Sequence, residues 1–132
     1  MRLVLENREI QIFGDGSQVR DFVYVDDAVE AFLAAGATDA VNGEAFNVGG
    51  EEHISHRDLV QMLVEIAGSG RYTFVDWPPE KKVIDIGSFY ADSSLLRGRV
   101  GWAPVVSLRE GFARTFEYYR QHLSHYVGEG SV

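Results

Sequence analysis

The 132-residue chain contains no cysteine, so its sequence offers neither a disulfide nor a thiolate ligand for a metal ion. It also lacks any apolar run approaching the roughly 20 residues that span a bilayer. Its first residues show no basic region followed by an apolar block and a small-residue cleavage site, as a secretory signal would. From these absences we expect a cytoplasmic protein without a membrane partner.

Positive charge is scarce in this sequence, where 12 Lys and Arg residues stand against 20 Asp and Glu residues. The formal net charge is −8. Broad binding to nucleic acid requires a basic face that displaces counterions, so we expect no nucleic-acid partner. An anionic small molecule could bind only where individual Arg, Lys and backbone N–H groups are placed together.

The glycine pattern of a dinucleotide-binding turn, in which G-x-G-x-x-G joins a strand to a helix, is also missing. The glycine groups at 14–16 and 49–50 have a different spacing and context. We therefore expect that this chain alone does not bind NAD. The content of 45% apolar and 24% charged residues is ordinary for a globular protein, and the length suits one domain.

Short strands and helices are predicted to alternate along the chain, which indicates an α/β (α+β) fold with a small mixed sheet and three main helices. There are too few strands for a complete doubly wound sheet. In chain order we predict strands at 10–13 and 20–25, a helix from Asp26 to Gly36, a strand at 44–48, a helix from Ser55 to Gly68, a strand at 71–76, an extended segment at 83–86, a short helix at 93–98 and a last helix from Ser107. We expect one domain at 1–126 and a disordered tail at 127–132.

Helix-capping residues and apolar stripes support these helices. Asp26 is the predicted N-cap of the first long helix, whose apolar stripe contains Val29, Phe32 and Leu33. Capping boxes are predicted for the two later helices, at Ser55 with Asp58 and at Ser107 with Glu110.

Residues 12–27 read IFGDGSQVRDFVYVDD. More than any other stretch of the chain, they combine residues that constrain the backbone with a residue suited to ligand binding. Two short extended runs flank a Gly-Asp-Gly-Ser turn, in which Gly14 and Gly16 can adopt positive φ angles. Arg20 follows directly, and its planar guanidinium suits bidentate contact with a phosphate.

This stretch is the first of an ordered series of motifs that covers nearly the whole chain. The others are Phe46-Asn47-Val48-Gly49-Gly50, Tyr90-Ala91-Asp92-Ser93-Ser94 and Gly101-Trp102-Ala103-Pro104, followed by a helix near Leu108. The series resembles the C-terminal, substrate-binding part of the extended short-chain dehydrogenase/reductases. These are NAD-dependent nucleotide-sugar epimerases and dehydratases of the UDP-glucose 4-epimerase type. The resemblance implies the C-terminal part of such a fold, without its complete Rossmann domain.

The resemblance also implies which chemistry this sequence lacks. In that family the catalytic base is a Tyr with a Lys four residues later. The two lysines here, Lys81 and Lys82, are preceded at that distance by Trp77 and Pro78. We therefore expect this chain alone to be inactive, with NAD a cofactor of the parent family and no catalytic residue present.

Four residues match the family's substrate-binding positions. By resemblance, Arg20 contacts the diphosphate of a UDP- or dTDP-linked sugar and Phe13 packs near the base. Arg20 could instead pair with Asp21 or Asp26, and Phe13 could be a core aromatic residue.

Lys82 and Asp85 match an Arg-x-x-Asp pattern whose Arg meets the diphosphate and whose Asp meets the ribose. Lysine departs from that pattern, since it offers a point charge without the guanidinium fork. The alternative for Lys81-Lys82 is a solvated loop. Asn47, Asp92 and Trp102 match positions that we interpret as structural.

A metal site is not expected at the histidine pairs His53/His56 and His122/His125. Both pairs have i, i+3 spacing, but neither has a carboxylate or cysteine at a persuasive spacing.

A self-associating module is the alternative to a binding domain. In the absence of the family's larger half, apolar surface is expected on the helix from Asp27 and the strand from Glu44. A truncated reading frame with no independent role is a third possibility.

Overall fold

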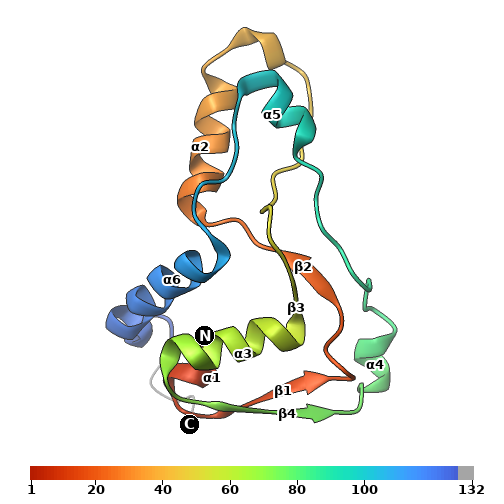
Figure 1. Cartoon of the computed structure of the whole chain (residues 1–132), viewed down its shortest axis with the longest axis vertical. Coiled ribbons are helices and arrows are strands. Elements are labelled where there is room, and N and C mark those ends of the chain that lie inside the picture. The colour runs from red at the N-terminus through yellow and green to blue at the C-terminus, as the bar shows by residue number, and fades with distance from the viewer. Residues whose placement is uncertain (128–132) are drawn as a thin grey trace. The chain divides into compact units, whose positions relative to one another are not determined.

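A computed structural model describes residues 1–127 of the chain, so all but the first residue of the predicted tail lies outside the described residues. The helices are α1 (Arg2–Leu5), α2 (Val25–Gly36), α3 (His56–Ala67), α4 (Pro79–Lys82), α5 (Ser94–Val100) and α6 (Leu108–His122), with 3-10 turns at Asp39–Val41 and Leu123–His125. The strands are β1 (Glu9–Phe13), β2 (Val19–Asp21), β3 (His53–Ser55) and β4 (Arg71–Val75). This mixed architecture, with α2, α3 and α6 as its main helices, confirms the predicted fold class (Figure 1). No helix in this described part is long and apolar enough to cross a membrane.

The chain divides into two compact units, and each is built from separate segments of the sequence. The first combines residues 1–17, 55–85 and 112 onward, and the second combines 18–54 and 86–111. The expected small sheet consists of two pairs of strands, β1 with β4 and β2 with β3.

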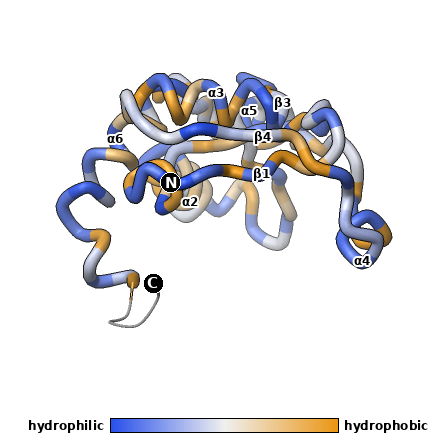
Figure 2. The backbone as a smooth tube through the Cα atoms, turned by 90° about the horizontal axis from the view of Figure 1, so that it is seen from below, coloured by the Kyte–Doolittle hydropathy of each residue, from blue (hydrophilic) through white to orange (hydrophobic). Residues whose placement is uncertain are grey.

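In the first unit, β1 and β4 run parallel and side by side (Figure 2). Glu9 stands opposite Arg71 at one end of the pair, and Phe13 opposite Val75 at the other. The core of this unit forms where α1, α3 and α6 contribute the buried side chains of Val4, Leu63 and Phe116. Parallel strands need a long crossover, and α3 lies in the connection between these two.

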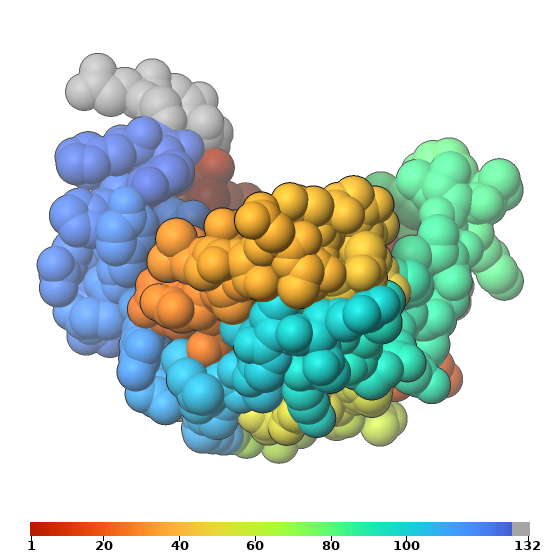
Figure 3. All heavy atoms as spheres, turned by 90° about the horizontal axis from the view of Figure 1, so that it is seen from above, coloured from red at the N-terminus to blue at the C-terminus, as the bar shows by residue number. Residues whose placement is uncertain are grey.

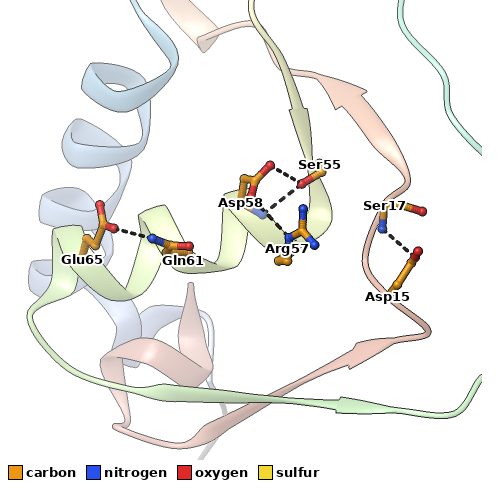
Figure 4. Close-up of polar contacts among 7 residues, drawn as sticks. All are labelled: Asp15, Ser17, Ser55, Arg57, Asp58, Gln61 and Glu65. Carbon is orange, nitrogen blue, oxygen red and sulfur yellow. Dashed lines mark hydrogen bonds and ion pairs between the residues drawn. The ribbon is translucent and has the colours of Figure 1, made fainter.

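The start of α3 confirms the predicted Ser55 cap. Ser55 Oγ accepts a hydrogen bond from the Asp58 N–H at 3.1 Å, and its hydroxyl donates to the Asp58 carboxylate at 2.6 Å (Figure 4). The carboxylate therefore bonds to the hydroxyl of the cap residue, a variant of the usual capping box. The Ser55 hydrogen bond holds the pKa of Asp58 below its ordinary value. Gly68 ends the helix in the left-handed conformation with φ 64°.

The core of the second unit contains Ala31 of α2, Leu96 of α5 and Trp102. The Trp102 Nε1–H donates to the Asp27 carbonyl oxygen at 2.9 Å, in agreement with the structural role predicted for this tryptophan. Asp27 is only 3% exposed. Its carboxylate accepts hydrogen bonds from the N–H groups of Val105 and Val106 at 3.1 and 3.0 Å. One helix residue thus binds a segment nearly 80 positions later in the chain.

The predicted N-cap at Asp26 is wrong. The helix α2 begins at Val25, after an N-cap at Tyr24 that makes no side-chain capping bond, and β2 ends at Asp21 instead of reaching Val25. Asp26 lies in the first helical turn, where a carboxylate is favoured by the helix dipole.

The predicted strand at 44–48 and the extended segment at 83–86 are also absent from the described structure. Phe46 and Val48 do pack against the core of the second unit, with exposed residues between them, as in a strand. Among the described residues, however, no strand lies alongside to complete a ladder. At 83–86, backbone bonds from Val83 to Pro79 and from Asp85 to Lys82 continue the turn of α4 instead.

Candidate functional site

The predicted turn after β1 is present, with φ angles of 65° at Gly14 and 67° at Gly16. Asp15 Oδ1 accepts a hydrogen bond from the Ser17 N–H at 3.0 Å (Figure 4). Hydrogen bonds from Ser17 lower the pKa of Asp15, since they stabilise the carboxylate form. The Arg57 N–H donates to the Gly16 carbonyl oxygen at 3.0 Å and so ties the turn to the first residues of α3.

A glycine is required at position 14 because the Trp77 indole packs directly against the backbone there. A Cβ built at Gly14 would lie 2.5 Å from Trp77 Nε1 and 2.9 Å from Trp77 Cδ1, so any side chain here would push the indole away. The Gly14 N–H also donates to the Val75 carbonyl oxygen at 2.8 Å, which continues the pairing of β1 with β4. The indole is therefore fixed against the backbone directly after Phe13.

The ring of Phe13 contacts an aromatic ring and a lysine ammonium of the first unit. Its ring centroid lies 5.4 Å from that of Trp77 at an interplanar angle of 43°, and Lys81 Nζ lies 4.6 Å from the Phe13 centroid, over the ring. Both are contacts that an aromatic face favours. A cavity of about 220 Å³ adjoins this cluster; its lining residues are Gln11, Ile12, Phe13, His56, Leu59, Val60 and Trp77.

Lys81 is the lysine that lies over the Phe13 ring. Lys82 is exposed at the end of α4, and Asp85 is half-buried three residues later. The sequence prediction did not place Trp77 or Lys81 beside Phe13. A usable signal was present in Trp77-Pro78-Pro79, because a proline at the first helical position starts a helix and fixes where the following lysines lie.

Arg20 lies in the second unit, on β2. Its Nη1 donates to the carbonyl oxygen of Val19 at 2.8 Å and to that of Gly87. The segment after Gly87 lies beside β2, since the Val19 N–H donates to Ser88 Oγ and the Phe89 N–H donates to the Val19 carbonyl oxygen, each at 3.0 Å. These two bonds to backbone carbonyl oxygens orient the guanidinium.

The second glycine group packs tightly inside its own unit. The Gly49 N–H donates to Ser93 Oγ at 2.9 Å, and a Cβ at Gly49 would overlap the Asp21 carboxylate. A Cβ at Gly50 would overlap the carbonyl oxygen of Phe22. These glycines therefore permit close packing of one backbone segment on another.

The fold places the chain among mixed α/β proteins, and comparisons with known proteins narrow this class. Residues 1–49 match the model of the NAD dependent epimerase/dehydratase family. The UDP-glucose 4-epimerase of Mycolicibacterium smegmatis is 38% identical over 89% of this chain and 36% of its own length. The dTDP-glucose 4,6-dehydratase of Streptomyces griseus is 32% identical over 92% of this chain and 36% of its own.

Solved structures give the same result. The UDP-glucose 4-epimerase of Thermotoga maritima, solved with UDP-glucose, matches 92% of this chain and 38% of its own with a TM-score of 0.80 and 35% identity. The UDP-glucuronic acid 4-epimerase of Bacillus cereus, solved with NAD, matches 91% of this chain and 37% of its own with a TM-score of 0.75 and 34% identity. These matches confirm the predicted resemblance: the chain is similar to NAD-dependent epimerases and dehydratases. It spans about a third of the length of the curated relatives it matches.

Proposed function

We propose that residues 1–126 form the nucleotide-sugar-binding, C-terminal part of an NAD-dependent sugar epimerase or dehydratase. The observation that carries this proposal is the similarity to a UDP-glucose 4-epimerase solved with UDP-glucose, which extends over 92% of the chain. The other relatives named above also act on UDP- or dTDP-linked sugars, to judge from their names. A UDP- or dTDP-linked sugar is accordingly the proposed ligand.

Each proposed site residue has the chemistry that its role requires. Arg20 would contact the diphosphate, because its planar guanidinium can donate two parallel charge-assisted hydrogen bonds to phosphate oxygens. Phe13 would offer a ring face to the base, and Lys82, whose side chain is exposed, would add a point charge toward the diphosphate. Asp85 would accept hydrogen bonds from the ribose hydroxyls.

The glycine groups of this chain do not fit the pyrophosphate of NAD. A helix N-terminus cradles a pyrophosphate only where glycines leave the backbone open to the ligand. Here the space beside Gly14 is filled by Trp77, and the space beside Gly49 and Gly50 by Asp21 and Phe22. NAD is therefore proposed only as the cofactor of the parent family.

Replacing Arg20 tests the proposed phosphate contact. We expect UDP-glucose or dTDP-glucose to bind the wild-type chain saturably in a calorimetric titration. Arg20→Ala should weaken that binding by about 1.5–3 kcal/mol, the range for a hydrogen bond to a charged group. Arg71→Ala is the matched control, because it removes an exposed strand arginine that pairs with Glu9. Equal affinities of wild type and Arg20→Ala, or a folded chain that binds neither sugar nucleotide, would contradict the proposal.

A second candidate function, self-association, is favoured by the outward face of α2. The large apolar side chains of this helix point away from its core contact, with Val25 62%, Val29 48%, Phe32 77% and Leu33 60% exposed. The small side chains of Ala31, Ala34 and Ala35 are the ones that pack against the core. Atoms of α2 (orange) lie at the surface beside those of α5 (teal) in Figure 3. A helix that is apolar on both faces needs a partner on each.

Size-exclusion chromatography over a range of concentrations tests this candidate. If α2 joins two copies, the wild-type elution volume should shift toward a dimer as concentration rises, and Phe32→Glu should elute as a monomer throughout. Val105→Glu places the same charge on another exposed residue of this unit, 85% exposed, and should leave the dimer intact. A wild-type chain that stays monomeric at all concentrations would rule out self-association.

A further inference from the structure

We propose that Lys81 covers the face of Phe13 on which the base of the nucleotide would stack, so that binding must first displace its ammonium group. This inference rests on the proposed function, because it concerns the same Phe13 site. The family resemblance assigns the diphosphate contact to Lys82 and gives Lys81 no role. The inference gives Lys81 a regulating role.

The geometry of the ring leads to this inference. Lys81 Nζ lies over the Phe13 ring, 4.6 Å from its centroid, and a stacked base would need that space. The ammonium and a base therefore exclude each other from the same ring face. The contact is an exposed cation–π interaction, which is weak enough for a ligand to replace.

The other contacts of Phe13 hold its ring in place, so Lys81 is the side chain that must move. Trp77 packs against the ring at 5.4 Å, and the close approach of Gly14 holds the indole against the backbone. Phe13 also belongs to β1 and pairs with Val75 of β4. Lys81, in contrast, is exposed on the short helix α4 and carries a flexible four-carbon stem.

The displaced ammonium would then be available to the phosphate groups of the same ligand. A nucleoside without phosphates must displace Lys81 and offers the displaced ammonium no anionic partner. A nucleoside diphosphate must displace it as well, but offers the ammonium a charge-assisted contact. Lys81 should therefore oppose the binding of a nucleoside and support the binding of a nucleoside diphosphate.

Calorimetric titration of uridine and UDP into wild type, Lys81→Ala and Lys82→Ala tests the inference. Lys81→Ala should bind uridine about two- to fivefold more tightly than wild type, since the ring face is uncovered. The same variant should bind UDP about tenfold more weakly, because the contact to the phosphates is lost. Lys82→Ala makes the same change of charge one residue away, at the proposed diphosphate contact, and should weaken UDP binding without tightening uridine binding. Arg71→Ala removes an exposed arginine of the same unit and is the control that should leave both affinities unchanged. Lys81→Arg keeps a cation over the ring and should restore the wild-type ratio of the two affinities.

The opposite signs for uridine and UDP separate this role from a merely structural one. If UDP binds but Lys81→Ala changes both affinities in the same direction, or matches Lys82→Ala, the inference is overturned and the proposed function stands. If neither uridine nor UDP binds wild type or Lys81→Ala, the inference and the proposed function are both overturned. Tighter uridine binding with weaker UDP binding in Lys81→Ala alone is the result that supports it.

Discussion

Replacing Asp27 by alanine is expected to lower the free energy of unfolding by about 2–5 kcal/mol, the largest effect of any single polar side chain described above. The carboxylate is buried and is the acceptor for the N–H groups of Val105 and Val106. Its removal leaves two part-buried backbone donors without that acceptor, and each hydrogen bond to a charged group contributes about 1.5–3 kcal/mol. The segment around Val105 would also lose its attachment to α2.

Urea denaturation followed by far-UV circular dichroism measures this effect as a lower transition midpoint at an unchanged slope. Asp27→Asn should fall between alanine and wild type, because its amide oxygen can accept from one of the two N–H groups but its NH₂ group cannot accept from the other. Asp26→Ala is the control on the same helix, since Asp26 is exposed. A loss below about 1 kcal/mol for Asp27→Ala would be incompatible with two charge-assisted bonds to a buried carboxylate.

Gly50→Ala is expected to destabilise the chain by about 3 kcal/mol, because the added methyl group has no space. A Cβ at this position overlaps the carbonyl oxygen of Phe22 and lies 2.9 Å from its carbonyl carbon. Both atoms belong to the backbone, which cannot move aside as the end of a flexible side chain can. The measurement is again the midpoint of urea denaturation.

Gly98→Ala provides the matched control in the same unit. Gly98 is an exposed residue inside α5, and a Cβ there would meet no atom within 4 Å. Alanine should stabilise the helix at this position by about 0.5–1 kcal/mol, since glycine is the poorer helix former. Opposite signs for the two glycine-to-alanine changes are the expected pattern. Equal, small effects would show that the loop at Gly50 can move away from Phe22 at little cost.

Sequence reasoning located the elements whose ends depend on local chemistry. The Ser55 and Ser107 caps are present, with the Glu110 N–H donating to Ser107 Oγ at 3.3 Å, and Gly68 ends α3 as predicted. Such features depend on residues three or four positions apart, so a single sequence contains them. Asp27 shows the limit of this approach: its partners lie at 105 and 106, and no local pattern links an aspartate to residues that distant.

The strand predicted at 44–48 shows a second limit of sequence reasoning. Residues 44–48 have the composition of a strand, but a strand forms only where another strand supplies its hydrogen bonds, and none does in the described part of the chain. The contact of Lys81 with Phe13 was likewise not predicted, because it depends on the turn of helix that starts at Pro79. A shift of one residue on a helix rotates a side chain by about 100°, which pattern spacing cannot resolve without the helix start.

The distribution of the two tryptophans makes each unit separately observable in solution. Trp77 belongs to the first unit, beside Phe13, and Trp102 belongs to the core of the second, where it is 6% exposed. A chain with one indole replaced by phenylalanine therefore emits fluorescence from one unit alone. Two such single-tryptophan chains would show by their emission whether the units lose structure together or one after the other, so cooperativity between them becomes directly measurable.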